Sequence, residues 1–218
     1  VVGIDIDGFG FDYYYFVDKD SKSLTKLEAM LKERFPLKSR KMAFKTGDAN
    51  KKVLELVEYA KTHPKCSALV LLDPFGMQLD WATIEALKTI KHLDLWILVP
   101  SGVIINRLLK RNGEIMYPKN LTRFFGMSEN ELKAYFYERQ VEQTLFGEDV
   151  RIKKARNAIE RIAQLYVDRL KTLFECVTEK PLVLRNSTNC PIFHFVFASH
   201  NETGLKIASQ IVGKKNKK

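Results

Sequence analysis

Apolar runs rich in β-branched and aromatic residues alternate with segments of helical periodicity through the N-terminal half of the chain. The runs predict strands and the periodic segments predict helices. In chain order these are strands at 2–7, 13–17, 41–45, 68–72 and 93–99, with helices at 24–34, 51–62 and 81–88. Alternation of this kind is typical of α/β proteins. The run 68–72 is apolar throughout, which predicts a central strand covered on both faces.

The pattern changes after the last of these strands. We expect an inserted helical segment over about 107–150, in which a Ser128-x-x-Glu131 capping box precedes a helix over 129–140. Apolar residues at helical spacing then predict one long amphipathic helix over 151–174.

The C-terminal part predicts a hairpin followed by a helix. Apolar runs at 181–184 and 192–198 flank a polar turn, as in an antiparallel β-hairpin, and 205–212 has helical spacing. Because neither an internal repeat nor a linker interrupts the sequence, we expect one domain over 1–218. The expected fold is α/β, a doubly wound, mostly parallel sheet with a C-terminal antiparallel hairpin and the inserted helical segment.

The first two predicted strands are closely spaced. Parallel neighbours need a connection of about a dozen residues or more, and the segment between these strands is shorter. Either 2–7 and 13–17 are not parallel neighbours, or residues between about Gly8 and Phe11 are missing from the sequence.

Composition limits the class of protein. Hydrophobic residues make up 45% and charged residues 28% of the chain, which excludes global disorder. No apolar stretch approaches the ~20 residues that a membrane-spanning helix needs. Three cysteines, Cys66, Cys176 and Cys190, show no Cys-x-x-Cys spacing. This argues against a disulfide framework or a zinc site and favours a cytoplasmic location.

The chain is strongly basic, since 36 Lys and Arg residues against 26 Asp and Glu give a formal net charge of +10. Nucleic acid, RNA or DNA, is the commonest partner of such a surface because phosphate contacts dominate its affinity. A solvated basic surface with a lysine-rich C-terminal end is the alternative.

Candidate ligand-binding residues follow the first predicted strand. Asp7, Gly8 and Gly10 stand where the backbone of a glycine lets a ligand approach the carboxyl edge of the sheet. The alternative is a tight glycine turn that binds nothing.

Acidic residues also follow the next two strands. Asp18 could accept hydrogen bonds from a ribose diol, or else Asp18 or Asp20 caps the helix that follows. Asp48 could reach an adenine amino group, with Ala49 leaving room for a flat ring. Alternatively, Asp48 or Asn50 caps the next helix, and these roles can coexist.

The sharpest motif is Asp73-Pro74-Phe75-Gly76, which follows the apolar strand 68–72. The carboxylate of Asp73 could orient an uncharged amine nucleophile, Pro74 stiffens the turn, and Phe75 offers a ring for stacking a base. The alternative is a proline turn with Phe75 in the core.

The four motifs fall in order at the ends of successive predicted strands, and as a set they resemble those of class I methyltransferases. More narrowly, the chain resembles the three-Cys-motif partner proteins, a bacterial family with a methyltransferase-like, Rossmann-like fold. The residues that carry this resemblance are Asp-Gly-Phe-Gly at 7–10, Tyr-Phe-Val-Asp-Lys-Asp at 15–20, Thr-Gly-Asp-Ala-Asn at 46–50, Leu-Asp-Pro-Phe-Gly at 72–76, Leu-Trp-Ile-Leu-Val-Pro at 95–100, Asn-Arg-Leu-Leu at 106–109 and Ile-Phe-His-Phe-Val-Phe-Ala-Ser-His at 192–200.

The resemblance implies that the first three motifs bind S-adenosylmethionine and that Asp73-Pro74-Phe75 faces the methyl acceptor. It also implies a possible cysteine-motif partner protein. Asp-Pro-Phe-Gly is not the Asp-Pro-Pro-Tyr type of amino-methylating DNA enzymes, so methylation of adenine N6 is not implied.

The sequence therefore predicts a methyltransferase that acts on a nucleic-acid base amine. One alternative is a partner subunit with a methyltransferase-like fold and no catalysis. Another is a metal-dependent nuclease of a mobile element, with Asp5, Asp7 and Asp73 converging at one sheet edge. His194 lies between two phenylalanines in a predicted strand, which favours a structural role.

Overall fold

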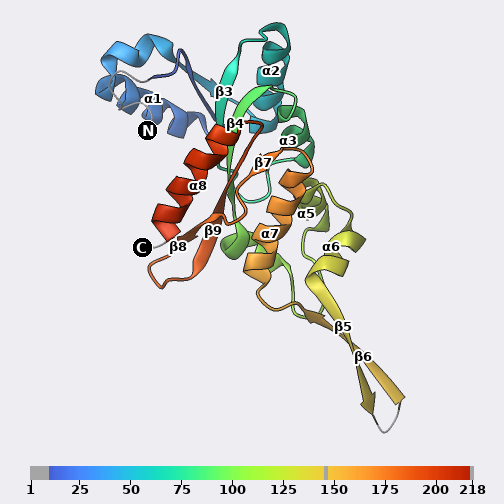
Figure 1. The fold of residues 1–218 in the computed structure, drawn as a ribbon. Helices are drawn as coiled ribbons and strands as arrows, with labels where there is room; N and C mark the ends of the chain where they lie inside the picture. The colour runs from blue at the N-terminus through green and yellow to red at the C-terminus, as the bar shows by residue number, and fades with distance from the viewer. Residues whose placement is uncertain (1–9, 145–146, 217–218) are drawn as a thin grey trace. The chain divides into compact units, whose positions relative to one another are not determined.

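The computed structural model describes residues 10–144 and 147–216 (Figure 1). The chain consists of two compact units, 1–56 and 57–218. The boundary between the units falls within a helix. The predicted strand 2–7, and with it Asp5, Asp7 and Gly8, lies outside the described residues.

Unit 1 is built around a strand–helix–strand segment. Its elements are β1 (Tyr14–Asp18), α1 (Ser21–Arg34), the short 3₁₀ helix η2 (Pro36–Lys41), β2 (Met42–Thr46) and the first part of α2 (Ala49–Thr62). β1 and β2 pair in parallel, with Phe16 opposite Phe44 and Asp18 opposite Thr46. The sequence predicted each of these strands and both α-helices to within a few residues.

Hydrophobic side chains of α1 and the two strands form the core of unit 1. The rings of Phe16 and Phe44 stack across the strand pair with their centroids 4.9 Å apart. The buried members of this core are Tyr14, Leu31, Phe35 and Met42, with Phe11, Phe16, Leu27 and Phe44 packed against them. The packing fixes β1 beside β2 and thereby places the residues that follow the two strands at one edge.

Unit 2 contains a mixed sheet of five strands, ordered β3-β4-β9-β7 with β8 also on β9. These strands are β3 (Ser67–Leu72), β4 (His92–Val99), β7 (Cys176–Val177), β8 (Leu182–Arg185) and β9 (Pro191–Ser199). Only β3 and β4 are parallel, and β9 is antiparallel to β4, β7 and β8. The predicted C-terminal hairpin is confirmed as β8 and β9.

The prediction of a doubly wound, mostly parallel sheet is wrong. The parallel pairs are β1–β2 and β3–β4, each joined by a single α-helix, and the remaining described pairs are antiparallel. The physical reason is that residues 107–154 do not return the chain to the sheet by a further crossover. They form helices and a separate hairpin, after which β7, β8 and β9 enter the sheet in antiparallel pairing.

The position of β3 also differs from the prediction. A continuous apolar run was expected to be a central strand, but β3 lies at an edge of the five-stranded sheet, and Leu69 and Leu71 are exposed. β4 is an inner strand, between β3 and β9, and its buried residues Leu93, Leu95 and Ile97 alternate along it.

The helices of unit 2 are α3 (Trp81–Leu87), the π-helical turn η3 (Ser101–Ile105), α4 (Asn106–Leu108), α5 (Pro118–Phe125), α6 (Glu129–Phe136), α7 (Ala158–Lys171) and α8 (Glu202–Asn216). The predicted capping box is confirmed, because the Ser128 hydroxyl accepts from the Glu131 amide and the Glu131 carboxylate accepts from the Ser128 amide. No helix within the described residues is long and apolar enough to cross a membrane.

The predicted helix over 151–174 is only partly correct. Its first residues belong to β6 (Gly147–Lys154), which forms an antiparallel hairpin with β5 (Tyr137–Thr144), and α7 begins at Ala158. Asn157 separates the two with a positive φ of 54°, which a continuous helix does not allow. The same hairpin ends α6 at Phe136, short of the predicted boundary at 140.

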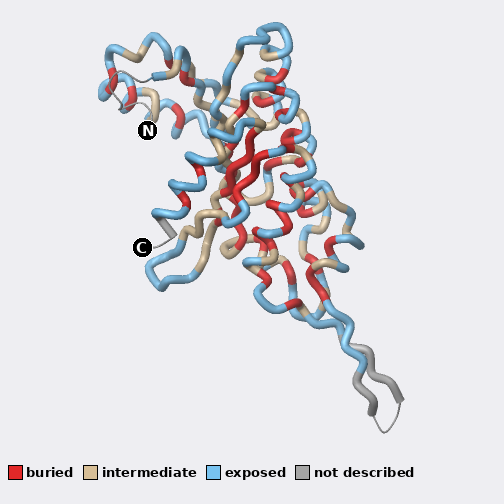
Figure 2. The backbone as a smooth tube through the Cα atoms, in the orientation of Figure 1, coloured by how far each residue is buried: buried red, intermediate tan, exposed pale blue. Residues whose placement is uncertain are grey.

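The buried interior of unit 2 follows β4, β9 and α7 (Figure 2). At its centre, the ring of Tyr166 contacts Phe124 at a centroid distance of 4.9 Å and Trp81 at 5.8 Å. Phe125 and Phe136 complete this aromatic cluster. The cluster joins α3, α5, α6 and α7 and supports the base of the β5–β6 hairpin.

Candidate functional site

The loops after β1 and β2 meet at the carboxyl edge of the strand pair in unit 1. The Gly47 amide donates to the Asp18 carbonyl oxygen at 2.9 Å. The Lys19 ammonium pairs with the Asp48 carboxylate at 2.8 Å. These two contacts bring the predicted residues Asp18 and Asp48 to the same edge, as expected of residues that follow parallel neighbouring strands.

The side chain of Asp18 is exposed, and only one of its two carboxylate oxygens accepts a hydrogen bond from a described residue. Its Oδ1 accepts from the Asp20 amide at 2.8 Å, and no described residue donates to Oδ2. The cap of α1 is Asp20, as predicted: its carboxylate accepts from the Lys22 amide at 3.0 Å and from the Ser23 hydroxyl at 2.6 Å. Asp18 is therefore left with an acceptor directed to solvent or to a ligand.

Asp48 is more heavily engaged than Asp18. Its Oδ1 accepts from the Asn50 amide at 2.9 Å at the start of α2, so the predicted capping role is observed. Its Oδ2 binds Lys19, and this hydrogen bond is the main cause of a pKa below the ordinary value of 3.8. Asp48 is therefore ionised at neutral pH.

The positions of the other predicted cofactor residues indicate no contact with a ligand. Ala49 is exposed as the first residue of α2. Gly10 is exposed, and a Cβ there would lie 3.3 Å from the Tyr14 hydroxyl. Asp7 and Gly8 lie outside the described residues, so the first motif is represented by Gly10 alone.

The motif Asp73-Pro74-Phe75 follows β3 in unit 2 and forms a separate group. The Phe75 ring is 85% exposed, so the alternative that it belongs to the core is wrong. Asp73 is also exposed, and within the described chain its carboxylate has no hydrogen-bond or ion-pair partner. A free carboxylate and a free aromatic ring thus stand two residues apart at the carboxyl end of a strand.

His194 has the structural role that the sequence predicted. It lies on β9 with 4% of its surface exposed, and its Nδ1 is 2.6 Å from the hydroxyl of the buried Ser101. Burial lowers the pKa of His194, the charge of Arg185 lowers it further, and Glu160 opposes the shift. Because both partners are buried, this Ser–His pair is not accessible to a substrate.

Neither a disulfide nor a metal cluster involves the described residues. Cys66, Cys176 and Cys190 are free thiols. No group of three or more His, Cys, Asp or Glu side chains in the described ranges is arranged to hold a metal ion. Asp5 and Asp7, which the nuclease alternative requires, fall outside those ranges.

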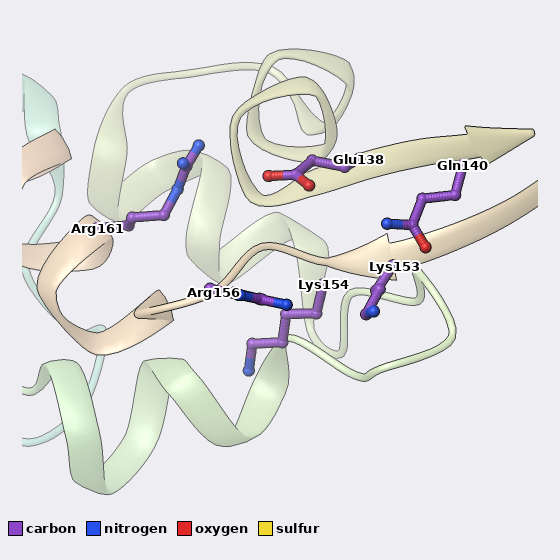
Figure 3. A pocket seen from close by; sticks show the side chains of 6 residues that line it. All are labelled: Glu138, Gln140, Lys153, Lys154, Arg156 and Arg161. Carbon is purple, nitrogen blue, oxygen red and sulfur yellow. The ribbon is translucent and has the colours of Figure 1, made fainter.

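Sequence analysis missed a basic hollow of about 270 Å³ at the root of the β5–β6 hairpin. Side chains from both strands and from α7 surround it (Figure 3). We call it the hairpin hollow, and its lining residues are Glu138, Gln140, Lys153, Lys154, Arg156 and Arg161. The alternation of apolar and charged residues in Val150-Arg151-Ile152-Lys153 is a strand signal that could have indicated it.

Comparisons of the chain with protein family models, with curated proteins and with solved structures find no match. The indications of function are therefore the residues themselves. They are the Asp18–Asp48 edge of unit 1, the exposed Asp73 and Phe75 of unit 2, and the hairpin hollow.

Proposed function

We propose that the chain binds S-adenosylmethionine at the carboxyl edge of β1 and β2 and transfers its methyl group to an amine of a nucleic-acid base. The observation that carries the proposal is the hydrogen bond from the Gly47 amide to the Asp18 carbonyl, because it holds the two acidic loops together. A strand–helix–strand unit with ligand-binding groups outside the carboxyl ends of its strands is the usual arrangement for nucleotide-like ligands.

Asp18 and Asp48 have the chemistry that an adenosine group requires. The open Oδ2 of Asp18 can accept a hydrogen bond from a ribose hydroxyl, and its negative charge disfavours a phosphate on the ribose. Asp48 can accept from the adenine amino group if Lys19 releases its Oδ2. This exchange is inexpensive because an exposed ion pair contributes about 1 kcal/mol or less.

Asp73 and Phe75 have the chemistry that a base amine requires. The Asp73 carboxylate can accept from the amine and direct its lone pair, while Phe75 can stack on the base, an interaction that contributes about 1–3 kcal/mol. A cofactor held by Asp18 and Asp48 would supply an electrophilic methyl group on a sulfonium, and a neutral thioether would be its leaving group when the amine nitrogen is methylated. Asp73 or solvent would take the proton that the amine loses.

The same residues carry the resemblance to methyltransferases and to the three-Cys-motif partner family. Asp18, Asp48 and Asp73 are acidic residues of its second, third and fourth motifs, and the second motif also contains Asp20. The resemblance supports the cofactor and the class of reaction, whereas the accessibility of Asp18 and Phe75 supports these residues as the contacts.

Calorimetric titration with S-adenosylmethionine tests the cofactor site. We expect micromolar binding to the unaltered chain and its loss in Asp18→Ala. Asp12→Ala is the matched control, because Asp12 is an exposed carboxylate of the same unit that precedes β1. No binding by the unaltered chain, or equal binding by all three proteins, would contradict the proposed site.

A second candidate function is a partner subunit that retains a methyltransferase-like surface without catalysis. The Lys19–Asp48 ion pair favours it, since it already fills the acceptor that adenine would need. Lys19→Ala separates the candidates. Tighter binding of S-adenosylmethionine by this variant supports a cofactor site that Lys19 partly closes, and continued absence of binding supports the partner subunit.

A further inference from the structure

The geometry points to the hairpin hollow as a binding site for the phosphate groups of a nucleic acid. The lining of the hollow is by itself the evidence that the site takes an anion. That the anion belongs to a nucleic acid rests on the proposed function, which names a base amine as the methyl acceptor.

Among the described residues, the lining of the hollow carries more positive than negative charge. Its lining contains four cationic side chains, those of Lys153, Lys154, Arg156 and Arg161, and one carboxylate, that of Glu138 (Figure 3). None of these six side chains forms an ion pair with a described residue. The exposed ion pairs elsewhere in the chain show that such pairing is common on this surface, so the hollow is an exception.

Lys154 is a fixed, partly buried cation. Its ammonium donates to the Asn106 carbonyl and to Asn106 Oδ1, both at 2.7 Å, and to the Leu109 carbonyl at 2.8 Å. These neutral acceptors satisfy its hydrogen bonds but do not cancel its charge. Burial lowers the pKa of Lys154, and the nearby positive charge of Arg111 lowers it further. An anion in the hollow would offset both unfavourable effects.

Arg161 is held in place by its neighbours and keeps N–H groups without an acceptor among the described residues. Its Nη2 donates to the Tyr135 carbonyl, and its guanidinium lies 4.8 Å from the centre of the Tyr135 ring. The buried Nε has no acceptor, and no described residue accepts from Nη1. A guanidinium that is oriented by its neighbours and keeps unused N–H groups is well suited to bind a phosphate.

The side chains of Lys153 and Arg156 are exposed and make no hydrogen bond with any described residue. They can therefore close on a bound anion without breaking an existing contact. Arg156 and Arg161 also flank the first turn of α7, where the helix dipole adds positive potential.

The lining favours a nucleic-acid backbone over a small metabolite. Sites for small molecules are lined mainly by apolar and aromatic side chains, whereas all six lining side chains here are charged or amide groups. Contacts from Lys and Arg to phosphate are the main source of affinity for nucleic acids. The net charge of +10 extends the attraction beyond the hollow itself.

The test is fluorescence anisotropy with short, labelled, single-stranded RNA and DNA over a range of salt concentrations. The variant is Lys153→Ala/Arg156→Ala, which removes two exposed cations without known partners. The matched control is Lys65→Ala/Lys91→Ala, which removes two exposed lysines of the same unit outside the hollow. Circular dichroism checks that all proteins are folded.

We expect the hollow variant to bind more weakly, with the slope of log K against log salt reduced in magnitude by about 1.4, or about 0.7 for each lost contact to a single strand. We expect the control to keep the slope of the unaltered chain. An unchanged slope in the hollow variant, or an equal reduction in the control, would overturn the site.

Inorganic phosphate distinguishes the source of the anion. If it binds in a manner that depends on Lys153 and Arg156 while oligonucleotides do not, the nucleic-acid assignment is wrong. Binding of S-adenosylmethionine is measured on the same proteins. It should be unaffected in the hollow variant, and Asp18→Ala should bind oligonucleotides normally. Failure of the anion site and failure of the cofactor site are therefore seen in different assays.

Discussion

The hydroxyl of Tyr166 provides a sharp test of the packing in unit 2. Tyr166 is 0% exposed, and its hydroxyl has no hydrogen-bond partner among the described residues. Burial raises the pKa of this hydroxyl far above its ordinary value. An unsatisfied buried polar group costs about 1–3 kcal/mol. Tyr166→Phe removes the group and keeps the ring contacts with Trp81 and Phe124.

We therefore expect Tyr166→Phe to raise the free energy of unfolding by about 1–2 kcal/mol. This is less than the full cost of an unsatisfied polar group because the lost oxygen leaves a small void. For a unit of this size, each kcal/mol corresponds to about 2–4 °C in the midpoint of thermal unfolding. The assay is urea unfolding followed by tryptophan fluorescence. It reports on unit 2 because both tryptophans of the chain, Trp81 and Trp96, lie there.

Tyr137→Phe is the matched control, and it should change the free energy of unfolding in the opposite direction. The Tyr137 hydroxyl donates to the Glu114 carbonyl at 2.9 Å, and burial raises its pKa to about 12. Its removal takes one hydrogen-bond donor away from the Glu114 carbonyl, so we expect the free energy of unfolding to fall by about 1 kcal/mol. If Tyr166→Phe were destabilised to a similar extent, the Tyr166 hydroxyl would have to have a hydrogen-bond partner, and the prediction would be wrong.

Two further predictions concern His194 and Gly126. Burial lowers the pKa of His194 below 6.5, so its contribution to stability is complete above pH 6.5 and is lost as the pH falls toward the folded-state value. Through His194, the free energy of unfolding can change by at most about 1.4 kcal/mol per pH unit. This pH dependence should disappear in His194→Gln but persist in the exposed His92→Gln. Urea unfolding between neutral and acidic pH measures it. Equal slopes in all three proteins would count against this role. Gly126 has a φ of 63°, and a Cβ there would lie 2.2 Å from Trp81 Cδ1, so Gly126→Ala should destabilise unit 2 by at least about 1–3 kcal/mol. Gly213→Ala, where a Cβ meets nothing within 4 Å, should leave the thermal midpoint unchanged or raised; equal midpoints for the two variants would refute the close approach at Gly126.

Local structure could be predicted from the sequence because each element has its own signal. Asp20 caps α1, and Ser128 and Glu131 form the predicted capping box, since short side-chain acceptors bind the nearest free amides. Helical spacing failed between 151 and 157, where Ile152 and Ala155 fit a helix as well as a strand. The positive φ of Asn157 ends that segment, and no periodicity in the sequence shows it.

Strand pairing could not be predicted, because it depends on contacts between distant parts of the chain. The apolar run of β3 has the composition of an inner strand, yet β4 takes the inner position with β9 beside it. The placement of Asp18 and Asp48 at one edge could be predicted, because it needs only two neighbouring parallel strands. The exposure of Phe75 and the charge of the hairpin hollow could not, since both depend on what packs nearby in three dimensions.

The most direct test of the proposed function is transfer of labelled methyl groups from S-adenosylmethionine to RNA and DNA, with Asp73→Ala beside the unaltered chain. The account predicts incorporation by the unaltered chain and a loss of about 10²-fold or more in Asp73→Ala, with equal affinity of the two proteins for S-adenosylmethionine. Equal incorporation by the two proteins would contradict the role of Asp73. No incorporation into any nucleic acid by a chain that binds both the cofactor and the nucleic acid would contradict the proposed reaction itself.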